Sequence, residues 1–142
     1  AGIRIHEKSI DRFKNKIREL TRRNQGRSLE YMLQKLRQYT TGWLNYYAIA
    51  DMKDFMQQAN GWIKRKIRCY IWKQWKRIKT RFEKLQALGV SRGKAWEWAN
   101  TRKGYWHISN SWILSKTLTD KRIIQMGYDD IFIRYNELHS SY

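Results

Sequence analysis

Residues 55–82 read FMQQANGWIKRKIRCYIWKQWKRIKTRF, a stretch without an acidic residue or a proline. Nine Lys or Arg lie between Lys64 and Arg81. On a helix, which turns about 100° per residue, the apolar and basic side chains of this stretch separate onto opposite sides. The stretch 55–82 therefore predicts a long amphipathic helix with a basic face. The apolar side holds Ile63, Ile67, Tyr70, Ile71 and Ile78, and the basic side holds Arg65, Arg68, Trp72, Lys76 and Lys79.

Trp72 lies near the middle of this basic face, and two interpretations of its side chain stay open. In one, the indole packs on a neighbouring element, as most tryptophans do. In the other, it stacks on a base or ribose, or pairs with an arginine. The sequence does not decide between a core residue and a binding residue.

Two further helices are expected upstream of this stretch. Ser9 is a candidate N-cap for the first, with Asp11 in its first turn, and residues 24–26 (Asn-Gln-Gly) end it. Ser28 is a candidate N-cap for the second. Both segments place apolar side chains at the spacing of one helical face. These are Ile10, Phe13, Ile17 and Leu20 in the first, and Leu29, Met32, Leu36, Tyr39, Trp43 and Tyr46 in the second.

The third helix is expected to begin at Asp51 or Asp54, with Phe55 and Ala59 extending its stripe. Thr80 and Glu83 form a capping-box pattern, which predicts that a new helix begins near Arg81. Shorter elements follow. They are a stop at Gly89, a helix from Ser91 to Trp98, an irregular or briefly extended stretch at 103–110, a helix ending at Gly127 and one capped by Asp129.

The chain has no proline, although about 5% would be usual, so nothing interrupts long helices. We therefore expect an all-α fold with three longer helices in residues 9–79 and shorter ones after. The expected division is a helical bundle over residues 1–79 and a small helical region over residues 80–142.

The net charge of +18 points to a polyanionic partner. Residues 1–119 hold 27 basic and 8 acidic residues, whereas residues 120–142 hold 3 and 4. Phosphates neutralise Lys and Arg with release of counterions, so nucleic acid is the first candidate. A membrane fits less well, because no apolar run approaches the ~18 residues needed to span a bilayer. No signal peptide is visible.

A second basic cluster lies in the first expected helix and the loop after it. A charge run on a helix is usually a solvated face, but the only acids here are Asp11 and Glu19. The cluster therefore suits phosphate binding better than salt-bridged solvation. Its members are Arg12, Lys14, Lys16, Arg18, Arg22, Arg23 and Arg27.

Catalytic and metal-binding patterns are missing from the sequence. His6, His107 and His139 are far apart and Cys69 is the single cysteine, so no zinc-ligand pair and no internal disulfide exist. No nucleophile elbow or phosphate loop is present. Residues 128–130 (Tyr-Asp-Asp) resemble part of a polymerase metal motif, but the spacing is wrong. We expect no catalytic residue, metal or cofactor.

Several motifs together resemble the maturase-specific region of group II intron-encoded proteins, over roughly residues 9–135. Relatives often have proline near residue 78, where this chain has Ile78. The motifs are Arg27-Ser28, Gly42-Trp43-Leu44-Asn45-Tyr46-Tyr47, Trp62-Ile63-Lys64-Arg65-Lys66-Ile67-Arg68, Trp72-Lys73-Gln74-Trp75-Lys76, Leu85, Leu88-Gly89-Val90 and Lys103-Gly104-Tyr105-Trp106.

The resemblance implies a fragment of a longer, bacterial-type cytoplasmic protein whose N-terminal part is a reverse transcriptase. In this family a helical thumb follows that part and grips intron RNA, and a small C-terminal region is linked to target DNA. A Cys- and His-containing endonuclease follows in many relatives, and its absence from this sequence fits either a lineage that lacks the nuclease or a trimmed chain. The implied partners are group II intron RNA, the reverse transcriptase domain and, as a second nucleic acid, target DNA.

We therefore expect a non-enzymatic RNA-binding maturase fragment that promotes intron folding and splicing, and that supports reverse transcription and intron mobility in its parent. The alternative is a DNA-binding module built on helices of residues 80–142. The residues expected to bind RNA are Arg18, Arg22, Arg23, Arg27, Lys64, Arg65, Arg68, Trp72, Lys73, Lys76, Arg77 and Lys79.

Overall fold

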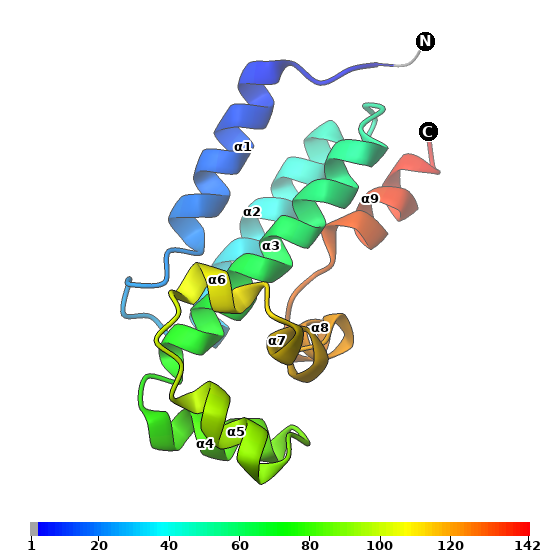
Figure 1. Cartoon of the computed structure of the whole chain (residues 1–142). Helices are drawn as coiled ribbons and strands as arrows, with labels where there is room; N and C mark the ends of the chain where they lie inside the picture. The colour runs from blue at the N-terminus through cyan, green and yellow to red at the C-terminus, as the bar shows by residue number, and fades with distance from the viewer. Residues whose placement is uncertain (1–2) are drawn as a thin grey trace.

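The computed structural model describes residues 3–142, which form nine helices and no strand (Figure 1). The expected all-α fold is therefore confirmed. The helices are α1 (Glu7–Leu20), α2 (Leu29–Tyr47), α3 (Lys53–Gln74), α4 (Ile78–Ala87), α5 (Arg92–Ala99), α6 (Tyr105–Ser109), α7 (Trp112–Thr117), α8 (Asp120–Met126) and α9 (Ile131–His139).

The three longer helices pack together, with α1 and α3 running in the same direction and α2 running in the opposite direction (Figure 1). Phe13 of α1 is fully buried at their centre, with its ring 4.4 Å from that of Trp43 and 5.9 Å from that of Phe55. The expected stripes supply most of this core. Tyr46 is an exception, because it is 76% exposed.

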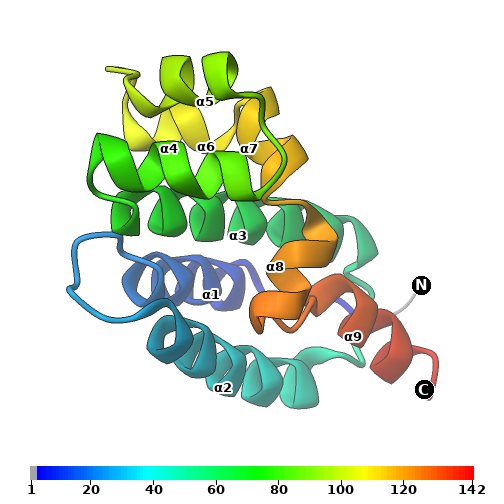
Figure 2. The same ribbon diagram turned by 90° about the horizontal axis from the view of Figure 1, so that it is seen from below.

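The shorter helices gather around α3. Helices α4 and α5 pair with each other beyond the C-terminal end of α3 (Figure 1), α6 packs on α3, and α9 packs on both α2 and α3 (Figure 2). The expected boundary between residues 79 and 80 falls within α4. The division into two domains stays a prediction.

Three of the expected helix caps and stops are confirmed. The Ser28 side chain accepts a hydrogen bond from the Tyr31 N–H, as expected of an N-cap. Gly89 has φ +97°, and the Val90 N–H bonds to the Leu85 carbonyl, which closes α4 in a Schellman motif. Gly127, with φ +124°, ends α8 in the same way.

The first helix begins earlier than expected. His6 caps α1 by accepting from the Lys8 N–H, so Ser9 is not the cap. Ser9 lies inside the helix on its buried side, where its hydroxyl accepts from Tyr47 at 3.3 Å and from Arg12 at 3.2 Å. The contact with Tyr47 on α2 therefore explains why a serine lies on the buried side of α1.

The break after α3 also lies earlier than the capping box predicted. Helix α3 ends at Gln74 and α4 begins at Ile78, so Thr80 lies within α4 and caps nothing. Arg81 returns toward α3 and donates to the Trp72 carbonyl at 3.1 Å. This carbonyl is one of the C-terminal carbonyls that a helix cannot satisfy internally, and a cation is favourable there.

Two expectations for the C-terminal region were wrong. The stretch 103–110 was not expected to be helical, but its residues 105–109 form α6. Arg65 donates to the Trp106 carbonyl at 2.7 Å and holds this short helix on α3. Asp130, rather than Asp129, caps α9, accepting from the N–H groups of Phe132 and Ile133. Asp129 instead pairs with Arg134.

Candidate nucleic-acid interface

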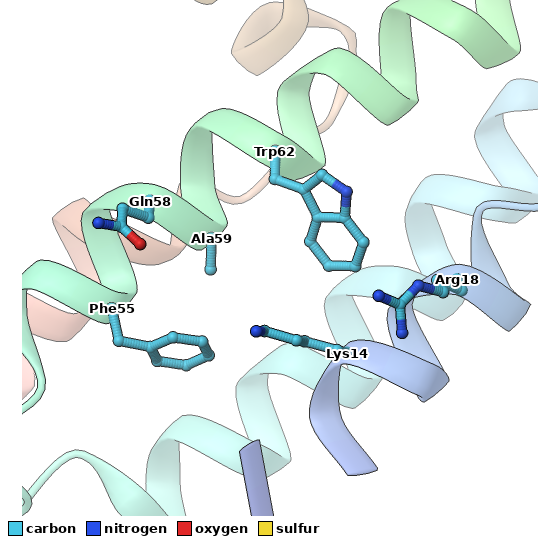
Figure 3. A pocket seen from close by; sticks show the side chains of 6 residues that line it. All are labelled: Lys14, Arg18, Phe55, Gln58, Ala59 and Trp62. Carbon is cyan, nitrogen blue, oxygen red and sulfur yellow. The ribbon is translucent and has the colours of Figure 1, made fainter. Parts of the chain in front are cut away.

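Three hollows follow one another along the seam between α1 and α3, with volumes of about 260, 530 and 520 Å³. The first and second share Arg18, and the second and third share Arg23 and Lys73. We call them together the α1–α3 groove; Figure 3 shows the first. It is lined by Lys14, Arg18, Arg22, Arg23 and Arg27 from α1 and its loop, Phe55, Gln58, Trp62, Lys66, Lys73 and Lys76 from α3 and just beyond, and Tyr105 and Trp106 from α6.

The charge of the α1–α3 groove has one sign. Every charged side chain that lines the three hollows is a Lys or an Arg. From Phe55 to Lys73 the groove follows α3 for about 27 Å, at ~1.5 Å per residue. That length corresponds to about eight nucleotide steps at ~3.4 Å each. The groove therefore has the charge and the length to follow a nucleic-acid backbone.

Aromatic rings alternate with these cations. The Arg18 guanidinium lies 5.3 Å from the centroid of the Trp62 ring. The Lys66 ammonium lies between two rings, 5.0 Å from Trp62 and 5.3 Å from Trp106. Basic side chains and aromatic faces side by side are the combination that single-stranded nucleic acid binds, because phosphates meet the cations and bases stack on the rings.

The cations of the groove repel one another. The pKa of Lys66 lies below its ordinary value, first because the side chain is partly buried and then because Arg18 and Arg23 lie nearby. A phosphate bound between these side chains would supply the missing negative charge. The neighbouring positive charges thus make an anion favourable beside Lys66.

Lys64 and Arg68, both expected to bind RNA, are engaged inside the protein. The Lys64 ammonium lies 2.9 Å from Asp130 and 3.3 Å from Asp120. Arg68 donates to the Leu118 carbonyl at 2.8 Å and to Asp120 at 2.9 Å. These contacts attach α8 and α9 to the basic face of α3, so this part of the face is covered by the chain itself.

Asp130 is the centre of a buried polar network. Besides Lys64, its carboxylate accepts from the Asn60 amide, which in turn accepts from the Tyr128 hydroxyl at 2.7 Å. Burial would raise the pKa of Asp130, but the bonds from the Ile133 N–H, Lys64 and Asn60 hold it below its ordinary value. The Tyr-Asp-Asp segment that resembles a polymerase motif therefore anchors α9 on α3.

Arg65 and Trp72 also have partners within the protein. Arg65 donates to Ser109 and stacks on Trp106, with its guanidinium 3.8 Å from the ring centroid. Trp72 is 1% exposed, and Arg81 lies 4.4 Å from its ring centroid. The burial supports the first interpretation, in which Trp72 packs on a neighbouring element, and leaves its ring no open face for a base. The pairing with an arginine, which belonged to the second interpretation, is also present, and its partner is Arg81 of the same chain.

The other expected RNA-binding residues are accessible. Arg18, Arg22, Arg23 and Arg27 are exposed along α1 and its loop, and Lys73 faces them from α3. Lys76, Arg77 and Lys79 are exposed around the break after α3, where Lys79 lies 4.0 Å from Glu83. RNA contact by each of these residues stays a prediction.

Lys14 belongs to the basic cluster expected to suit phosphate binding, but six other groove residues were not predicted from the sequence as nucleic-acid contacts. They are Phe55, Gln58, Trp62, Lys66, Tyr105 and Trp106. A signal for Lys66 was present, since it follows Trp62 by four residues and precedes Lys73 by seven, which places all three on one helical face. Tyr105 and Trp106 offered no such signal, because their position depends on how α6 packs on α3.

Residues 3–142 lack both a metal-ligand cluster and a membrane-spanning helix. No group of three or more His, Cys, Asp or Glu side chains is placed to hold a metal ion. No helix in that range has the length and apolar character needed to cross a membrane.

Comparison with known proteins identified one family. The family described as "Group II intron, maturase-specific domain" matches residues 10–89, which include α1 from Ile10 onward and all of α2, α3 and α4. The match therefore covers both walls of the α1–α3 groove except for the part contributed by α6. A search of curated proteins found no match.

Proposed function

Because this chain belongs to the group II intron maturase-specific domain family, we propose that it binds group II intron RNA through the α1–α3 groove and promotes the folding and splicing of that RNA. The observation that carries the proposal is the groove itself, whose charged lining is entirely basic and whose cations alternate with aromatic rings.

The proposed mechanism is selective binding rather than catalysis by protein side chains. Phosphates that meet Lys and Arg release counterions, and this supplies most of the affinity. A protein that binds one folded form of the RNA more tightly than the others shifts the population toward that form. The three long helices suit this role, because a packed core centred on Phe13 holds the two walls of the groove at a set separation.

The same surface would serve a larger parent protein. We propose that it follows a reverse transcriptase domain in the parent, supports reverse transcription of the intron and contributes to intron mobility. The chain itself then acts as a binding domain without catalytic residues. Primer extension by the purified chain with magnesium would contradict this part of the proposal.

A DNA-binding role for α5 and α7 is a second candidate. Trp96 is 57% exposed and Trp112 is 50% exposed. Lys116 lies 5.8 Å from the Trp112 ring centroid, and Lys103 lies 5.8 Å from that of Trp98. Trp98 and Trp112, whose rings lie 5.8 Å apart, therefore place rings and cations together outside the α1–α3 groove, and Trp96 adds an exposed ring on α5. The chain thus has room for a second nucleic-acid partner.

Competition at fixed salt distinguishes the two candidates. Labelled, structured intron RNA bound to the full chain should be displaced by the same unlabelled RNA more readily than by duplex DNA. The double variant Arg23→Ala/Lys73→Ala should weaken RNA binding, whereas Lys121→Ala, an exposed control on α8, should not. Stronger displacement by duplex DNA, with unchanged RNA binding by the groove variant, would favour the DNA-binding role.

Splicing provides the functional test. Deletion of this region from the parent protein should abolish assisted splicing at low magnesium and should have a weaker effect on polymerisation along a simple template. Undiminished splicing by the truncated parent would contradict the proposal.

A further inference from the structure

The first hollow of the α1–α3 groove differs in shape from the other two. It is smaller, at about 260 Å³, and two aromatic side chains stand at its ends (Figure 3). Phe55, Ala59 and Trp62 are spaced four and three residues apart, so they share one face of α3. Ala59 forms the floor between the rings, and its small side chain is what leaves the space open.

One wall of this hollow is held in place by the core. The Phe55 ring lies 5.9 Å from Phe13 and 6.5 Å from Trp43. At the other end the Arg18 guanidinium and the Lys66 ammonium lie 5.3 and 5.0 Å from the centroid of the Trp62 ring. The Phe55 wall is therefore in place before a planar ring binds, which favours affinity.

The polar groups at the rim define the chemistry of a ligand. Lys14 and Arg18 of α1 reach the hollow from the side opposite α3, and no acidic residue lines it (Figure 3). Gln58 is exposed at the rim, and its amide has both donors and an acceptor. The site thus combines ring faces, a two-way hydrogen-bonding group and positive charge.

Size restricts the ligand further. The volume lies below the ~300–1,000 Å³ typical of sites for drug-sized molecules, so the hollow suits one planar ring system. The ring must also be attached to anionic groups, because Arg18 lines both this hollow and the next one. A nucleobase on an RNA strand meets both conditions, whereas an apolar protein segment would leave Lys14 and Arg18 without an anionic partner.

We propose that this hollow binds a single unpaired nucleobase of the RNA whose backbone follows the α1–α3 groove. The base would stack on Trp62 above Ala59, with Gln58 at its hydrogen-bonding edge and the adjoining phosphates on Lys14 and Arg18. The proposal rests on the proposed function and adds to it a preference for RNA with an unpaired nucleotide.

The test uses the full chain and two RNA hairpins that differ at one position. One carries a single bulged 2-aminopurine nucleotide, and the other carries an abasic site there. The wild-type chain should bind the first hairpin about 5- to 150-fold more tightly, which is the range for loss of one stacked base. The 2-aminopurine fluorescence should fall on binding.

Two variants should remove this preference. Ala59→Leu fills the hollow without changing charge, and Trp62→Ala removes the stacking surface. Both should bind the two hairpins equally and keep the salt dependence of the wild type. Tyr46→Ala is the matched control, because Tyr46 is 76% exposed on α2 outside the groove, and it should keep the preference. Thermal denaturation checks that each variant folds.

The outcomes separate this proposal from the proposed function. Equal binding of both hairpins by the wild-type chain, with a steep salt dependence, would overturn the base pocket and leave RNA binding by the groove intact. Weak binding of both hairpins with little salt dependence would contradict the proposed function itself. A third outcome is that the reverse transcriptase domain of the parent, instead of a base, covers the hollow. In that case Ala59→Leu would leave hairpin binding by the chain unchanged but would make the parent protein less stable, and this result too would overturn the base pocket.

Discussion

Replacing Asp130 by Asn should lower the free energy of unfolding by about 3 kcal/mol, whereas the same change at Asp120 should cost no more than about 1 kcal/mol. Both carboxylates pair with Lys64, at 2.9 and 3.3 Å. They differ in environment, since the Asp130 side chain is 7% exposed and that of Asp120 is 64% exposed. The two variants therefore compare the same Asp→Asn change at a buried and at an exposed partner of Lys64.

The magnitude follows from what the Asp130→Asn variant keeps and what it loses. Asparagine caps a helix about as well as aspartate, so the bonds from the Phe132 and Ile133 N–H groups to the side-chain oxygen remain. The negative charge opposite Lys64 is lost, and a buried cation without its partner costs about 3–5 kcal/mol. Asp120 still lies near Lys64, which places the expected value at the lower end of that range.

Thermal denaturation followed by circular dichroism is the assay. At about 2–4 °C per kcal/mol for a chain of this size, Asp130→Asn should lower Tm by roughly 6–12 °C and Asp120→Asn by no more than about 4 °C. Adding Lys64→Met to Asp130→Asn should recover much of the loss, because it removes the unpaired charge. Equal losses at the two aspartates, or no recovery, would refute the reasoning.

Three further results are expected. Trp72→Ala should lower the free energy of unfolding by about 3–5 kcal/mol, and urea denaturation would show this; a stable variant with weakened RNA binding would instead support stacking. Gly89→Ala should cost about 1–2 kcal/mol because of its positive φ, whereas Gly93→Ala within α5 should be neutral or stabilising by up to about 1 kcal/mol; equal effects in thermal melts would contradict the assignment of strain to Gly89. The pKa of Asp130 is lowered in the folded protein, so its carboxylate stabilises the fold at pH values above the ordinary carboxyl pKa of about 3.9, and this stabilisation is lost as the pH falls through the pKa of the folded state. The difference in stability between wild type and Asp130→Asn should therefore narrow in acid. A difference independent of pH would contradict this.

The features that could be predicted from the sequence are those set by neighbouring residues. The Ser28 cap, the stop at Gly89 and the apolar stripes each depend on a few residues close together in the chain. The true end of α3 depends on Arg81, whose partner is the Trp72 carbonyl across a turn. The cap of α1 was misplaced for a similar reason, because Ser9 faces Tyr47 on α2.

In the candidate site, too, the sequence predicted which side chains share a helical face but not which of them stay accessible. Arg18, Arg23 and Lys73 were expected to bind RNA, and they line the α1–α3 groove. Lys64 and Arg68 were chosen by the same criterion of a basic helical face, but α8 and α9 cover them through Asp120 and Asp130. A single helix shows which side chains share a face, but only the packing of the whole chain shows which face stays open.

The salt dependence of RNA binding tests the central claim most directly. For the wild-type chain, the logarithm of affinity should fall steeply with the logarithm of salt, by about 0.7–0.9 per phosphate contact. Arg18→Ala, Lys66→Ala and Lys73→Ala should each flatten that slope by about that amount, and Lys121→Ala should leave it unchanged. Slopes that stay at the wild-type value in all three groove variants would contradict binding of RNA in the α1–α3 groove.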